Sequence, residues 1–330
     1  MVKNNVAVSR FTFCSLLFLF FLSCGKSEKG TVVLKASLLV NEQHSWYQAF
    51  QFFEERLLEK SDGRLVLQTF PAEQLAKEVE AIRMIQAGVL DMTTTSSLLS
   101  NWTEIMTFCE MPFLLKKPEE VEVLMQGPLG KRIAEEMETK TGLVPLGYFQ
   151  AGVRQLTSNR PITHPDELSG LILRVPNVPS FVTAWDALGA KTTPMAFSEV
   201  FTSLQQGTID AQENPLALIK TSGFYEVQEY VNLTNHVVSW TYPVIGKKSL
   251  EKLPEDLKTI FLETSKEMMA YHQELFEQNQ QKIRQELEAA GMQFIEVDNA
   301  AFIDKCGTAI YDTLSPEMQG VYESVRAQLQ

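Results

Sequence analysis

Hydrophobic and polar positions in this chain switch repeatedly between the two-residue period of strands and the helical period near 3.6. Residues 31–40 are β-branched and aliphatic and predict a buried strand, and residues 64–70 predict a second one. Between them, Trp46, Phe50 and Phe53 share one face of a predicted helix that begins at Ser45. Strands that alternate with helices in this way predict an α/β fold.

The same alternation continues to the C-terminus. The further predicted helices are residues 73–87, residues 118–141 with a break at Gly127 and Pro128, and two helices that open at Ser180 and Ser198. The further predicted strands are residues 89–92, 142–149, 171–175, 231–233, 237–240 and 244–248. Two polar stretches, residues 93–97 and 212–215, are predicted to be loops, and residues 150–155 are predicted to carry Arg154 into a turn.

One short pattern occurs twice. Residues 84–92 (MIQAGVLDM) and 203–211 (SLQQGTIDA) share a helix end, a glycine, a short apolar strand and an aspartate. The repeat predicts two lobes built alike, each of which points a polar loop at a shared cleft. We expect lobe I to comprise residues 31–151 and about 240–279, and lobe II about 152–239 and 280–330.

The longest helical pattern covers residues 254–290, with Pro254 in its first turn and Gly291 beyond its end. Such a helix is about 55 Å long, which exceeds one lobe. We therefore expect it to span both lobes of a monomer. A coiled-coil seam that mediates dimerisation is the alternative.

The N-terminus predicts export. Lys3 and Arg10 form a basic segment before an apolar run, residues 11–22, that is too short to span a bilayer, so residues 1–23 are predicted to be a signal peptide. Cys24 is similar to the lipid-modified cysteine of bacterial lipoproteins, which would make residues 24–30 a tether on a membrane-anchored periplasmic protein. A plain cleaved signal peptide is the alternative.

Charge and cysteine content narrow the function further. The net charge of −12 argues against partners such as nucleic acid or an anionic lipid surface. Cys109 and Cys306 are too few to form a disulfide framework, so two buried free thiols are expected. The four histidines are scattered, and no nucleophile, metal or nucleotide motif is present in the sequence, which predicts a binding protein without cofactor or metal rather than an enzyme.

An anion site is the clearest candidate chemistry. Arg174 lies at the end of a predicted strand, just before Pro176, at the edge where ligands bind in open α/β sheets. With Arg154 it could form a clamp, because a guanidinium offers parallel N–H donors to a carboxylate. Asn214 can both donate and accept hydrogen bonds. Apolar walls are predicted from Phe197, Trp240 and Tyr242, with core packing as the alternative for the first two.

Four segments resemble the solute-binding subunit of tripartite ATP-independent periplasmic (TRAP) transporters: residues 72–92, 152–162 (GVRQLTSNRPI), 166–176 (DELSGLILRVP) and 187–215. The resemblance covers nearly all of the chain beyond the signal peptide. It implies a two-lobe periplasmic-binding-protein-like fold that closes about a hinge over an organic acid. It also implies that the acid is passed to the permease, a membrane symporter.

The resemblance assigns roles by position. Arg174 is similar to the carboxylate-binding arginine, Arg154 to the second arginine, Asn214 to the pocket asparagine and Phe197 to the aromatic residue beside the ligand. The further candidates are Thr94 and Ser97, the turn at His44, and Asn177, Trp240 and Tyr242. Residues 93–97 lack the carboxylate of some relatives, which argues against a sialic acid.

These observations together predict a receptor for a sugar acid, such as a uronate or an aldonate. A C4-dicarboxylate or sialic acid receptor of the same family is the alternative ligand class. A secreted enzyme and a sensory module that uses the same cleft are the alternative functions.

Overall fold

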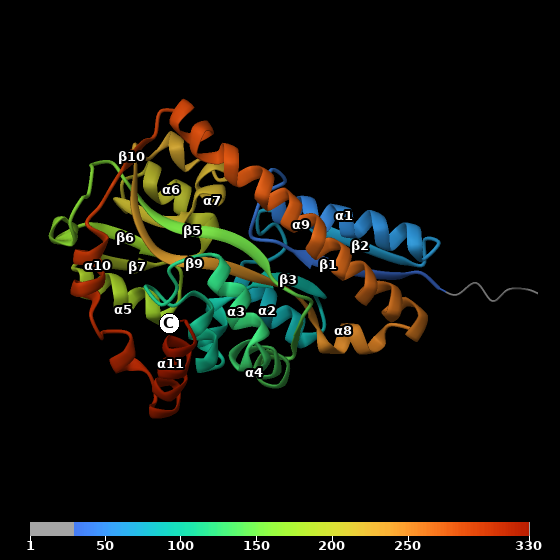
Figure 1. Ribbon diagram of the computed structural model, residues 1–330. Coiled ribbons are helices and arrows are strands. Elements are labelled where there is room, and N and C mark those ends of the chain that lie inside the picture. The colour runs from blue at the N-terminus through green and yellow to red at the C-terminus, as the bar shows by residue number, and fades with distance from the viewer. Residues whose placement is uncertain (1–29, 330) are drawn as a thin grey trace, which may run out of the picture. The chain divides into compact units, whose positions relative to one another are not determined.

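The computed structural model describes residues 30–329, apart from the side chain of Gln281. The chain from Thr31 onward forms one compact unit (Figure 1). The predicted signal peptide and Cys24 lie outside the described residues, as does the predicted tether except for Gly30. In the part of the chain that is described, no helix has the length and apolar character needed to cross a membrane.

A ten-stranded mixed sheet organises this unit, with eight strands in the order β2, β1, β3, β9, β5, β8, β6, β7 and with β4 and β10 also paired to β9. The strands are β1 (Val32–Ser37), β2 (Leu65–Phe70), β3 (Met92–Thr95), β4 (Leu143–Pro145), β5 (Phe149–Ser158), β6 (Ile172–Val175), β7 (Lys191–Pro194), β8 (Ala211–Pro215), β9 (Tyr230–Gly246) and β10 (Gln293–Ile295).

Strand β9 joins the two halves of the sheet. Residues 230–241 pair antiparallel with β5, and residues 242–246 pair with β3 and β4. The prediction of separate strands here was wrong, because the left-handed Asn235 (φ 46°) is absorbed as a register shift opposite β5. One continuous strand therefore runs through both halves.

The predicted helices are present, and α8, α10 and α11 are additional helices that were not predicted. They are α1 (Ser45–Lys60), α2 (Glu78–Ala87), α3 (Glu119–Gln126), α4 (Pro128–Glu136), α5 (Pro179–Leu188), α6 (Val200–Gln205), α7 (Leu216–Thr221), α8 (Lys247–Lys252), α9 (Glu255–Ala289), α10 (Asn299–Cys306) and α11 (Pro316–Gln328). Helix α2 begins later than predicted. Ala72 and Glu73 adopt left-handed conformations, and the Glu73 carboxylate accepts a hydrogen bond from the Glu78 amide.

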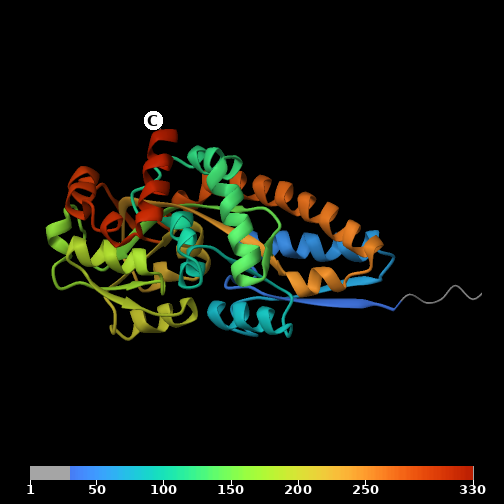
Figure 2. The same cartoon turned by 90° about the horizontal axis from the view of Figure 1, so that it is seen from below.

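Helix α9 spans both halves, as predicted. It packs on α1 and β5 and reaches α7. Figures 1 and 2 both show it alongside α1. The carboxylate of Glu267 in α9 forms ion pairs with Arg56 and Lys60 in α1.

Three segments that were predicted to be irregular are strands. The polar residues 93–97 and 212–215 belong largely to β3 and β8, and residues 150–155 lie within β5 rather than in a turn. All three are paired on the inside of the sheet. Their hydroxyl and amide side chains are therefore buried, which local polarity does not predict.

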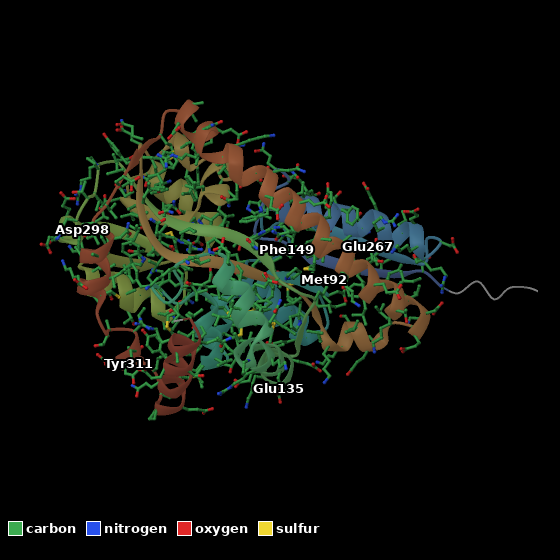
Figure 3. The ribbon with its side chains drawn as sticks, in the orientation of Figure 1. Met92, Glu135, Phe149, Glu267, Asp298 and Tyr311 are labelled. Carbon is green, nitrogen blue, oxygen red and sulfur yellow. The ribbon has the colours of Figure 1, made fainter. Side chains whose placement is uncertain are left out.

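The hydrophobic core packs around these strands. Met92 and Phe149 are completely buried, whereas Glu135 and Asp298 lie at the periphery (Figure 3). Cys109 and Cys306 are buried free thiols, which confirms that prediction.

Candidate functional site

A cavity of about 450 Å³ lies where the two halves of the sheet meet. The first half contributes the start of α2 and the segment after β3. The second half contributes the ends of β6 and β8 and the segment after β7. The polar and aromatic lining residues include Glu73, Lys77, Glu78, Arg83, Thr94, Ser96, Ser97, Glu110, Arg154, Arg174, Asn177, Phe197, Asn214, Ser239, Trp240 and Thr241.

Arg174 brings the least compensated charge to this cavity. It lies near the end of β6 with 3% of its surface exposed, and its Nε and Nη2 donate to the Met195 carbonyl at 3.2 and 2.8 Å. Among the described residues, no carboxylate lies within ion-pair distance of its guanidinium. Burial lowers the pKa of Arg174 to about 10, but the side chain stays cationic at neutral pH.

The hydrogen bonds of Arg174 leave one face of the guanidinium for a ligand. Of its five N–H groups, one on Nε and one on Nη2 point to Met195. The two on Nη1 and the second on Nη2 therefore have no partner among the described residues. The Nη1 and Nη2 nitrogens at the end of the guanidinium can therefore donate two parallel hydrogen bonds to the two oxygens of a carboxylate. The Phe197 ring covers the guanidinium, with 5.8 Å from Cζ to the ring centroid.

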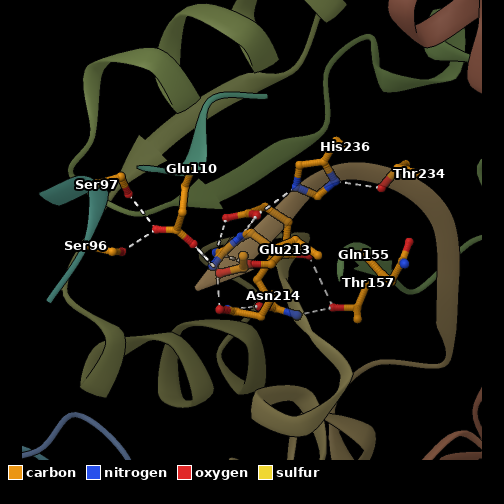
Figure 4. Close-up of polar contacts among 12 residues, drawn as sticks. Ser96, Ser97, Glu110, Gln155, Thr157, Glu213, Asn214, Thr234 and His236 are labelled. Atoms are coloured by element: carbon orange, nitrogen blue, oxygen red, sulfur yellow. Dashed lines mark hydrogen bonds and ion pairs between the residues drawn. The ribbon is translucent and has the colours of Figure 1, made fainter. Parts of the chain in front are cut away.

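Arg154 is also buried but is already paired. Its Nε donates to Glu213 Oε2 at 2.6 Å and its Nη2 to Glu213 Oε1 at 2.8 Å, in a bidentate pair. Nη1 reaches Glu110 Oε1 at 3.4 Å, and Nη2 also contacts Asn214 Oδ1 at 3.2 Å (Figure 4). The two arginines thus differ: Arg154 is held by carboxylates of the protein, whereas Arg174 has donors to spare.

His236 also contacts Glu213, the carboxylate that pairs with Arg154. His236 Nε2 lies 2.8 Å from Glu213 Oε2, and its Nδ1 lies 2.8 Å from the Thr234 hydroxyl (Figure 4). Burial alone would raise the pKa of Glu213, but the charge and hydrogen bonds of Arg154 outweigh it and lower that pKa to about 2. Glu213 is therefore ionised at neutral pH.

Another carboxylate, Glu78, faces the cavity from the first turn of α2. Burial raises its pKa to about 8, and the charges of Glu73 and Glu110 act in the same direction, whereas a Thr95 hydrogen bond and Arg174 oppose it. Glu78 is therefore largely protonated at neutral pH. In that form it can donate one hydrogen bond and accept others.

The cavity collects eight of the ten predicted contact residues: Thr94, Ser97, Arg154, Arg174, Asn177, Phe197, Asn214 and Trp240. The other two lie elsewhere. His44 accepts a hydrogen bond from the Trp46 amide at the start of α1 and lines a separate cavity of about 50 Å³. The Tyr242 hydroxyl lies 3.0 Å from Met125 Sδ and 4.0 Å from Cys109 Sγ, inside the core.

Several residues of the site were not predicted. Glu213 holds Arg154 and is itself contacted by His236, the Met195 carbonyl orients Arg174, and Glu110 lies in the wall. Glu213 precedes Asn214, so its position beside a predicted site residue was a usable signal. No local pattern distinguishes Glu110 from a surface carboxylate. Within the described residues, no cluster of histidine, cysteine and acidic side chains could hold a metal ion.

The chain is similar to known solute-binding proteins over most of its length. Residues 36–315 match the model of bacterial extracellular solute-binding protein family 7. A solute-binding protein of Roseobacter denitrificans is 42% identical over 294 residues, which cover 89% of this chain and 90% of the relative. The 2,3-diketo-L-gulonate-binding periplasmic protein of Escherichia coli is 31% identical over 275 residues, which cover 82% and 84%.

Solved structures agree with this match. The Roseobacter denitrificans protein, a TRAP periplasmic solute-binding protein with bound L-galactonate, superimposes with a TM-score of 0.87, covering 90% of this chain and 99% of that one. A TRAP periplasmic solute-binding protein of Citrobacter koseri with bound D-glucuronate gives 0.85 at 25% identity, covering 91% and 100%. The predicted two-lobe α/β fold is confirmed, and the chain is a solute-binding protein rather than an enzyme. It belongs to bacterial extracellular solute-binding protein family 7, the solute receptors of TRAP transporters.

Proposed function

We propose that this protein is a periplasmic receptor that binds a sugar acid and delivers it to the permease of a TRAP transporter. One observation carries the proposal: Arg174 is a buried cation with an unpaired end-on face in the cavity between the two halves of the sheet. A desolvated charge of this kind is stable when a ligand supplies the opposite charge. The similar proteins of Roseobacter denitrificans and Citrobacter koseri, which carry L-galactonate and D-glucuronate, support a hydroxylated acid.

The ligand would lie with its carboxylate on Arg174 and its hydroxyl groups along the polar wall. Asn214 retains one amide N–H for the ligand, because its other contacts are Arg154 and Gln212. Phe197 and Trp240 provide apolar faces, and Thr94, Ser97 and Asn177 supply further polar groups. Arg154 contributes mainly by fixing the position of Asn214. His44 and Tyr242 are left out of this proposal because they do not line the cavity.

Closure of two lobes about a hinge would capture the acid. The predicted division places residues 31–151 and about 240–279 in lobe I, and about 152–239 and 280–330 in lobe II. Three polar contacts at the cavity rim cross this division. They are the Lys77–Glu199 ion pair, the Ser198 amide to the Glu73 carboxylate at 3.2 Å, and Asn101 to the Asn177 carbonyl at 2.9 Å. These contacts are available only when the lobes are together.

The N-terminal predictions complete the proposal. Residues 1–23 would direct export, and lipidation of Cys24 would anchor the receptor to a membrane through the tether 24–30. The receptor would act as a monomer, with α9 as an internal strap. Metabolic labelling with a palmitate analogue, compared between the wild type and Cys24→Ala, tests the anchor.

Substitution of Arg174 tests the binding site. Arg174→Ala should weaken binding of the best sugar acid by about 3 kcal/mol or more, which is about a hundredfold in Kd, because the carboxylate is left buried and unpaired. Arg174→Lys should also bind poorly, since a point charge cannot replace the guanidinium fork. Titration calorimetry measures both, with the partly exposed Arg284→Ala as control. Wild-type affinity in Arg174→Ala would refute the assignment.

A further inference from the structure

Glu110 is a buried carboxylate in the cavity wall with four hydrogen-bond donors around it. It ends the short 3-10 helix η2 (Glu104–Glu110) and is 6% exposed. Its Oε2 accepts from the hydroxyls of Ser96 and Ser97, both at 2.6 Å (Figure 4). Its Oε1 accepts from the Ser239 hydroxyl and from Arg154 Nη1.

These bonds fix where the serine protons point. A hydroxyl has a single proton to donate, and Ser96, Ser97 and Ser239 each donate theirs to Glu110. All three serines line the cavity. What they can still offer a ligand is lone pairs, as acceptors. This wall therefore favours ligand groups that donate hydrogen bonds, as sugar hydroxyls do, and disfavours groups that only accept.

The charges around the cavity wall also favour a ligand with a single carboxylate. The formal charges of the two guanidiniums, Arg154 and Arg174, and the two carboxylates, Glu110 and Glu213, sum to zero, although both carboxylates contact Arg154 and neither contacts Arg174. A first carboxylate takes the free face of Arg174. The remaining cations on the cavity lining are Lys77, which is paired with Glu199, and the exposed Arg83 at the rim. A second carboxylate near Glu110 would meet like charge, and the buried cation there, Arg154, is already paired with Glu110 and Glu213.

We propose that Glu110 is a specificity-determining residue that restricts the site to acids with one carboxylate and several hydroxyl groups, and excludes sugar dicarboxylates of the same length. This inference rests on the proposed function and deepens it. Glu110 acts both through its own charge and through the three serines that it orients.

Pairs of aldonates and aldarates test the inference directly. Galactonate and galactarate, or gluconate and glucarate, share one carbon chain and differ only in a terminal CH₂OH or carboxylate. By titration calorimetry, the wild type should bind the aldonate of the pair about a hundredfold more tightly or better. Glu110→Gln removes one negative charge, so this ratio should fall by about tenfold or more, mainly through gained aldarate binding.

The outcomes distinguish a failure of the role of Glu110 from a failure of the proposed receptor function. Glu104 is an exposed carboxylate at the other end of η2, where it accepts a hydrogen bond from the Ser315 amide. Glu104→Gln is therefore the matched control and should keep the wild-type ratio of aldonate to aldarate affinity. An unchanged ratio in Glu110→Gln would overturn the role of Glu110 while leaving the receptor function intact. Wild-type binding of an aldarate within about threefold of its aldonate would also overturn it, without relying on the folding of a variant. No binding of any sugar acid by the wild type would overturn both proposals.

Discussion

Two buried histidines predict a measurable response of the folded state to mild acid. His44 is 2% exposed, and its Nδ1 accepts the Trp46 amide at 3.2 Å at the start of α1. His272 is 1% exposed and stacks on Phe149 with 4.1 Å between ring centroids, and its Nε2 has no hydrogen-bond partner among the described residues. Burial lowers the pKa of both to about 3, and for His44 the neighbouring His272 adds to the effect.

The sign and size of this change in stability with pH follow from proton linkage. The unfolded chain binds these protons with a pKa near 6.5, whereas the folded protein does not bind them until about pH 3. The stability of the neutral pair is therefore complete above pH 6.5 and is lost as the pH falls. Between pH 7.5 and 5.5 each histidine should lower the free energy of unfolding by about 1 to 2 kcal/mol, and the two together should lower it by about 3 kcal/mol.

A variant isolates this contribution. Glu78 has a raised pKa and acts in the opposite direction over the same range, so the wild type alone does not report on the histidines. In His44→Asn/His272→Leu, asparagine keeps a helix-capping acceptor and leucine keeps an apolar packing group. Urea denaturation at pH 7.5 and 5.5 should show that the wild type loses about 3 kcal/mol of stability relative to the variant on acidification.

The control is His164→Asn, which removes a partly exposed histidine that also caps a short helical turn. Its stability should run parallel to that of the wild type across the two pH values. Parallel curves for the double variant as well would refute the argument, because they would mean that the buried histidines titrate alike in the folded and unfolded chain.

Three further substitutions probe a buried ion pair and the close packing of a helix. Glu213→Gln should lower the free energy of unfolding by about 3 to 5 kcal/mol in urea denaturation, because it leaves the buried Arg154 short of one counter-charge; a loss of less than about 1 kcal/mol would contradict the pairing. Gly130→Ala should destabilise by about 2 kcal/mol or more in thermal unfolding, since an added Cβ would lie 2.2 Å from the Met125 carbonyl oxygen. Gly320→Ala in α11, where nothing lies within 4 Å, should instead stabilise slightly, and equal effects at both glycines would rule out the steric explanation.

Much of the fold was predictable because its signals are local. Pro254 and Gly291 bracket α9, and the apolar face of α1 is visible in its helical period. Pro176 follows β6, and this proline by itself indicates that Arg174 lies at the end of a strand. Such caps, breaks and periods act within a few residues, so they can be read along the chain.

The tertiary structure decided which polar groups lie inside. Residues 93–97 and 212–215 looked like loops because their side chains are hydrophilic, yet β3 and β8 are paired strands whose partners lie far away in the sequence. The clearest case is the two arginines. Both appear in the sequence as candidates for one clamp, but Glu213 and Glu110, 59 and 44 residues from Arg154, compensate its charge and leave Arg174 for a ligand. Charge pairing depends on distance in space, and only the packed sheet determines that distance.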